Sequence, residues 1–170
     1  TMVVNDSIDV MVSIYSPISF IYEPEKAFKE MYRVLKKGGK ILIMGHSFYN
    51  ALYSKVNNYN AKGEEIAQLF NNHVVTWAPH VPPLITYSKE SMESALHEAG
   101  FFVEKTYGVP VFVQPGPEDF NPGNEGVSRI SKYLDEPNIF NKIFEIEMMS
   151  NSLPSVANRG MNIFTLATKK

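Results

Sequence analysis

The stretch "VLKKGGKILIMG", residues 34–45, decides which fold this sequence can adopt. An apolar pattern at helical spacing leads into it from Ala27, and its basic residues suit the negative C-terminal end of a helix. Gly38 can take the left-handed conformation that ends helices, and Gly39 lets the backbone turn tightly. The stretch therefore predicts a helix that stops at the glycines, followed at once by an apolar strand over residues 40–45.

Similar signals on both sides extend this helix–strand alternation. Short β-branched runs indicate buried strands, and Pro24 and Ser88 are typical of helix starts. The predicted order is strand 8–13, a helix from 24, strand 40–45, helical pieces over 51–56 and 64–70, an irregular run over 76–83, helix 88–99, strand 101–107, helix 138–151 and strand 161–168. Alternation of this kind favours an α/β fold with a mostly parallel sheet.

Length and composition limit the classes of protein that fit. The 170 residues suit one domain, residues 1–170, and the 44% apolar and 20% charged content is ordinary for a globular protein. The net charge of −2 argues against nucleic acid or an anionic membrane as a partner. No apolar run approaches the roughly 20 residues that span a bilayer, and the absence of cysteine excludes thiol chemistry. A cytoplasmic protein is the default expectation.

Four segments, in this order, carry a resemblance to a known family. They are Asp9-Val10-Met11-Val12, then "RVLKKGG" at residues 33–39, "TYSKESMESALHEAGF" at 86–101, and "NIFTLATKK" at 162–170. Together they resemble the second half of class I S-adenosylmethionine-dependent methyltransferases, from the fourth strand to the seventh. The order of the four pieces is more specific than any one of them.

The resemblance implies a Rossmann-like half-sheet with strand order 4-5-7-6 and helices on its faces. In this sequence the order corresponds to residues 8–13, 40–45, 161–168 and 101–107, and the last strand in sequence is antiparallel to the others. Residues 8–13 then lie at an apolar edge. Because such an edge tends to add a strand, we expect it to pair with a missing N-terminal segment or with a second copy of the chain.

The resemblance also implies S-adenosylmethionine as the cofactor, but half of the expected pocket is absent. The family holds this cofactor with a glycine-rich loop after its first strand, and no G-x-G occurs among these 170 residues. The chain also begins at Thr1 rather than at methionine. We therefore expect a C-terminal part of a methyltransferase domain that needs an N-terminal cofactor-binding segment and is inactive alone.

The loop that follows the first strand is the predicted cofactor contact. Ser13, Ile14, Tyr15 and Ser16 lie at the carboxyl end of a parallel strand, where open α/β sheets bind ligands. By resemblance, this loop contacts the cofactor and faces the methyl acceptor. Tyr15 is the preferred contact, and its packing beneath the following insert is an equal alternative.

Residues 46–83 form the predicted insert or lid on the substrate side. His46 is the candidate to orient the acceptor or to take its proton, although a hydrogen-bonded structural histidine is the favoured interpretation. Tyr49, Trp77 and His80 are the other predicted substrate contacts, since aromatic side chains can stack on a planar acceptor. Core packing and loop anchoring are the competing roles for these side chains.

Two functions remain open at this point. The first is methyl transfer from S-adenosylmethionine to a small-molecule acceptor. The second is a non-catalytic binding or interaction module that retains half of the methyltransferase fold. No metal site is expected, and Glu145 and Glu147 are interpreted as solvated helix positions.

Overall fold

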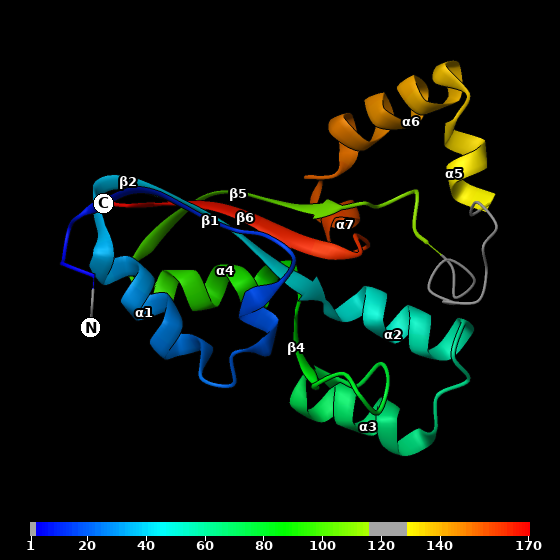
Figure 1. Cartoon of the computed structure of the whole chain (residues 1–170), viewed down its shortest axis with the longest axis horizontal. Helices are drawn as coiled ribbons and strands as arrows, with labels where there is room; N and C mark the ends of the chain where they lie inside the picture. The colour runs from blue at the N-terminus through cyan, green and yellow to red at the C-terminus, as the bar shows by residue number, and fades with distance from the viewer. Residues whose placement is uncertain (1–2, 116–128) are drawn as a thin grey trace.

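The computed structural model describes residues 3–115 and 129–170, which form a mixed sheet with helices mainly on one side (Figure 1). The strands are β1 (Ile8–Ser13), β2 (Leu35–Ser47), β3 (Val74–Val75), β4 (Leu84–Tyr87), β5 (Phe101–Val109) and β6 (Asn162–Lys169). The helices are η1 (Pro17–Phe20), α1 (Pro24–Val34), α2 (Phe48–Asn57), α3 (Gly63–Asn72), α4 (Lys89–Glu98), α5 (Arg129–Leu134), α6 (Pro137–Ser150) and α7 (Pro154–Ala157).

Strand β2 is the centre of the sheet. It pairs in parallel with β1, and antiparallel with β6 over Lys40 to His46. Strand β5 lies antiparallel on the far side of β6. At the carboxyl end of β2, His46 and Ser47 also pair in parallel with β4, and β4 carries β3 as its antiparallel neighbour.

The strand order of the whole sheet is β3-β4-β2-β6-β5, with β1 beside β2, so the sheet has two strands, β3 and β4, beyond the four in the predicted order. The pairing of β2 with β6 and of β6 with β5 is as expected, including the antiparallel direction of β6. The difference arises because β4 joins the same edge of β2 as β1, beyond the point where β1 ends. Strands of two and four residues were not predicted, since periodicity is weak over such lengths.

The glycines of the opening stretch do not end a helix, and this corrects the prediction. Helix α1 already ends at Val34, and Leu35 is extended and fully buried as the first residue of β2. Gly38 does take a positive φ of 77°, but it lies inside β2, where the register with β1 shifts. Burial of Leu35 in the core therefore stops the helix one turn early, and the glycines serve a bulge in the strand.

The main core lies between the sheet and the helices α1 and α4, below the sheet in Figure 1. Ile41 and Ile43 point into it and are fully buried. Neighbouring residues of a strand face opposite sides of the sheet, and on the other face Val10 and Val12 of β1 are 62% and 58% exposed. The expectation of helices on both faces is therefore wrong for β1 in the described part of the chain.

The insert forms a second, smaller apolar cluster. Both predicted helical pieces are confirmed as α2 and α3, and residues 76–83 are irregular as their prolines require. Leu69 and Ala51 are fully buried, and Phe48, Val75 and Leu84 complete the cluster. Because β4 anchors this cluster to β2, the insert is placed against the carboxyl end of the sheet.

Candidate functional site

The loop after β1 has a strained backbone. Tyr15 and Ser16 both lie in the left-handed region, with φ values of 64° and 57°, which residues other than glycine seldom adopt. Hydrogen bonds hold this conformation: the Tyr15 N–H donates to Met44 Sδ (3.1 Å), and the Ser16 hydroxyl donates to Asn162 Oδ1 (3.2 Å). The Tyr15 side chain is left 85% exposed beside the end of β2.

His46 lies near the carboxyl end of β2, where this strand pairs with β4 on one side and with β6 on the other. Its backbone N–H donates to the Ser19 hydroxyl (2.9 Å), and its side chain is only 8% exposed. Within the described residues, Nε2 of His46 is buried and has no hydrogen-bond partner. Burial lowers the pKa of this imidazole from 6.5 to about 4, against a smaller opposing effect of Asn162. The ring is therefore neutral at pH 7, and its low pKa makes it a weak base.

Trp77 packs directly against this histidine. The two rings meet edge to face, with centroids 5.5 Å apart, and Tyr59 lies on the tryptophan at 5.4 Å. The ammonium of Lys55 lies over the indole at 5.5 Å and is also paired with Glu65 at 2.5 Å. Since Lys55 belongs to α2 and Glu65 to α3, this ion pair joins the two helices of the insert behind Trp77.

The loop after β1, His46, Tyr59 and Trp77 line one cavity of about 1190 Å³ at the carboxyl ends of β1 and β2. Six of the eight predicted site residues contribute to its wall, namely Tyr15, Ser16, His46, Tyr49, Trp77 and His80. Ser13, which is paired with Ile43 in the sheet, and Ile14 do not line it. The structure thus brings together the two predicted groups of contacts, from the loop after β1 and from the insert.

Several wall residues were missed by the sequence analysis. They are Phe20, Met44, Asn50, Phe112, Gln114, Arg159 and Asn162, among others. One signal was available for Asn162: an antiparallel strand begins at the edge where its parallel neighbours end. The start of β6 therefore had to lie beside His46, and the two residues are indeed paired.

Glu147 is not a solvated helix position. Its Oε1 accepts the backbone N–H groups of Val111 and Phe112, both at 2.7 Å, and thereby holds the end of β5 against α6. Glu145 does lie at the surface, paired with Lys142 at 2.8 Å. Within residues 3–115 and 129–170, no three His, Cys, Asp or Glu side chains are grouped so that they can hold a metal ion.

Comparison with known proteins identifies the fold. The family described as "Methyltransferase domain" matches residues 2–43, while no curated protein matches the chain. A structure assigned as an S-adenosylmethionine-dependent methyltransferase from Listeria monocytogenes matches all of this chain and 65% of its own, with 13% identity and a TM-score of 0.56. A SAM-dependent methyltransferase structure from Methanosarcina mazei matches 99% of this chain and 62% of its own, with 12% identity and a TM-score of 0.53.

A third structure, a methyltransferase from Thermotoga maritima described as a possible histamine N-methyltransferase, has 19% identity and a TM-score of 0.50. The match covers all of this chain and 60% of that one. The chain thus has the class I S-adenosylmethionine-dependent methyltransferase fold, and it spans less than two thirds of these solved chains. Within the described residues, no helix has both the length and the apolar character needed to cross a membrane.

The buried imidazole of His46 predicts a specific loss of stability in acid. Between pH 6.5 and about 4 the unfolded chain binds a proton at this residue that the folded chain excludes, so stability falls as the pH falls. This effect should remove about 2 kcal/mol of unfolding free energy between pH 7 and pH 5. Urea unfolding at both pH values should show a smaller loss in His46→Gln, whereas His80→Gln, which changes an exposed histidine, should keep the full loss. An equal loss in all three proteins would contradict the assignment.

Proposed function

We propose that this chain belongs to an enzyme that transfers a methyl group from S-adenosylmethionine to a small-molecule acceptor. The observation that carries the proposal is the cavity of about 1190 Å³, in which the loop after β1 faces His46 and Trp77. Its position at the carboxyl ends of parallel strands is where open α/β sheets bind ligands. In this proposal the chain supplies the acceptor side of the site and one wall of the cofactor pocket.

The described residues fit one side of the cofactor. Tyr15 and Ser16 line the cavity on a backbone that two hydrogen bonds hold in a strained conformation, and they would hold S-adenosylmethionine together with the adjacent Ser13 and Ile14. When bound, the cofactor supplies a methyl group on a sulfonium. The glycine-rich loop that would hold the rest of it does not occur in this sequence.

The chain's own residues have three tasks in this proposal. The side chain of His46 lines the acceptor side of the cavity and is neutral at pH 7, so it helps to orient the acceptor without bringing a charge. Trp77 and Tyr49 orient the acceptor and exclude water from it, which favours alignment of the reacting groups. Residues 46–83 thereby act as a lid that sets the specificity for the acceptor.

Binding of the cofactor tests the proposal. We expect the isolated chain to bind S-adenosylmethionine weakly, with a dissociation constant above about 100 µM, because the backbone N–H groups of a glycine-rich loop are missing. In an NMR titration the amide shifts should concentrate at residues 13–16, and Tyr15→Ala should reduce them. Tyr133→Ala, which removes an exposed tyrosine of α5, should leave them unchanged. Low-micromolar binding would contradict the proposal that this chain supplies only one wall of the cofactor pocket. Absence of amide shifts at residues 13–16 would favour a non-catalytic module.

Trp77 tests the lid. In the active protein, Trp77→Ala should raise the KM for the acceptor at least several-fold more than the KM for S-adenosylmethionine, since the indole packs on the His46 side of the cavity. Phe70→Ala is a matched control, because Phe70 belongs to the same insert but is 68% exposed and does not line the cavity. Equal effects of Trp77→Ala on both KM values would argue against a lid over the acceptor.

We also propose that the free edge of β1 pairs with a further strand, from a separate N-terminal segment or from a second copy of the chain. In the described residues β1 has β2 as its only strand neighbour, and Val10 and Val12 are exposed beside that edge. Light scattering on the isolated chain should detect a dimer, and hydrogen exchange should show protection of the Val10 to Val12 amides. A stable monomer in which these amides exchange freely would refute the pairing.

A further inference from the structure

Among the residues that the structure describes, the charged side chains of the cavity wall have one sign. No aspartate or glutamate from the described part of the chain lines the cavity, and Arg159 is the one lysine or arginine there. Histidine and neutral side chains, many of them aromatic, make up the rest of the wall. Because a charged ligand loses hydration when it enters a cleft, it binds where a group of opposite charge replaces the water. This wall offers such a group to an anion and no carboxylate to a cation.

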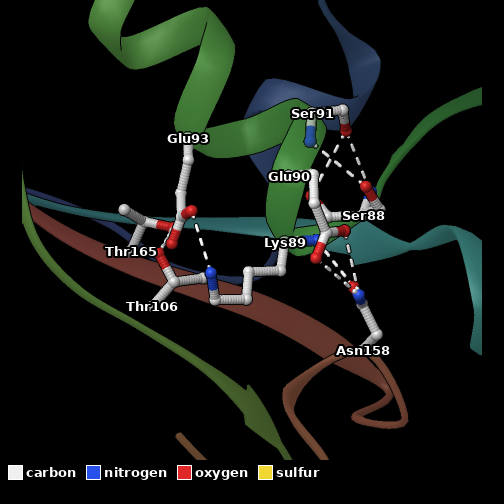
Figure 2. Close-up of polar contacts among 8 residues, drawn as sticks. All are labelled: Ser88, Lys89, Glu90, Ser91, Glu93, Thr106, Asn158 and Thr165. Atoms are coloured by element: carbon white, nitrogen blue, oxygen red, sulfur yellow. Dashed lines mark hydrogen bonds and ion pairs between the residues drawn. The ribbon is translucent and has the colours of Figure 1, made fainter. Parts of the chain in front are cut away.

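The backbone that carries Arg159 is firmly placed. Figure 2 shows the preceding residue, Asn158, at the start of α4: its Oδ1 accepts the Lys89 N–H at 2.7 Å, and its Nδ2 donates to the Glu90 carboxylate at 2.9 Å. On the cavity side, Nε2 of Gln114 donates to the carbonyl of Arg159 at 2.8 Å. The arginine is thus held at a defined point of the wall by contacts to its backbone and its neighbour.

The guanidinium of Arg159 itself has no carboxylate partner among the described residues.

The turn that carries Arg159 is closely packed. A Cβ added to the next residue, Gly160, would lie 2.4 Å from the Cα of Gly108, so the turn cannot easily relax. A guanidinium presents five N–H donors in a fixed planar array that matches a carboxylate in a bidentate way. Since no carboxylate of the described residues pairs with it, this arginine on a fixed turn is available to an anionic ligand.

Trp77 gives a second, independent reason to disfavour a cationic ligand. The Lys55 ammonium already lies over the indole at 5.5 Å, and this lysine is almost fully buried. A ring that already has a cation over it attracts a second cation less, and it stacks more readily with an electron-rich ring. The aromatic part of the wall is thus poorly suited to bind an ammonium group through this ring.

We propose that the acceptor of this site is a small molecule with an aromatic ring, a carboxylate and a separate nucleophilic atom that takes the methyl group. Its carboxylate pairs with Arg159 while its ring packs on the aromatic wall at Trp77. This inference rests on the proposed function only in calling the ligand an acceptor. Its binding requires neither the cofactor nor methyl transfer, so the two ideas fail in different experiments.

Three ligands with the same phenyl group, similar length and different charge test the proposal on the chain as it stands: 3-phenylpropanoate, 3-phenylpropanamide and 3-phenylpropylamine. Trp77 is the only tryptophan of the chain, so its fluorescence reports on ligands in the cavity. We expect the carboxylate to bind about tenfold more tightly than the amide, and the amine to bind most weakly. Added salt should weaken binding of the carboxylate and leave the amide unchanged.

Substitutions then locate the effect. Arg159→Gln should bring the carboxylate-to-amide ratio close to one, and Arg159→Lys should retain part of it. Lys29→Gln removes the same charge from an exposed position on α1, outside the cavity, and should keep the full ratio. Circular dichroism verifies that each variant is folded. Equal binding of acid and amide, tightest binding of the amine, a ratio that survives Arg159→Gln, or no binding of any of the three would overturn the proposal.

Discussion

Strand β2 bonds to neighbours on both of its edges, and the rest of the structure depends on this arrangement. Residues 40–46 pair with β6 on one edge, and residues 40–43 pair with β1 on the other. Beyond the end of β1, that second edge is free for β4, which brings in the insert. Because a strand offers only two edges, the end of β2 is where the loop after β1, the insert and the start of β6 must meet.

The direction of β6 determines which residues meet there. Parallel strands β1 and β2 end at the cavity, whereas the antiparallel β6 begins there. Asn162 is therefore paired with His46 and hydrogen-bonded to Ser16, although the three residues are far apart in sequence. The turn with Arg159 precedes β6 and arrives at the same edge. A parallel β6 would have placed this turn at the opposite end of the sheet.

The two faces of the sheet have different roles. Ile41 and Ile43 pack into the core under α1 and α4, where burial of each side chain stabilises the fold by roughly 1.5–3 kcal/mol. Val10 and Val12 face the other way and stay exposed. Sheets with parallel strands are generally covered on both faces. The solved methyltransferases are longer than the region that matches this chain.

The sequence by itself determined the fold class and most of the elements, and six of its eight predicted contact residues line the cavity. Periodicity located the apolar strands and both helical pieces of the insert, and the ends of parallel strands pointed to Tyr15 and His46. The sequence also predicted the positive φ of Gly38, but it wrongly assigned this residue to the end of a helix. Only the core contacts of Leu35 show that α1 stops before the glycines.

Only the tertiary structure decided the rest. Short strands such as β4 form because β2 has a free edge with which they can pair, and the local sequence does not show that this edge is free. Likewise, the neutral state of His46 comes from burial, and the place of Arg159 in the cavity comes from strand direction. Such properties depend on residues that are distant along the chain, so a local sequence pattern cannot contain them.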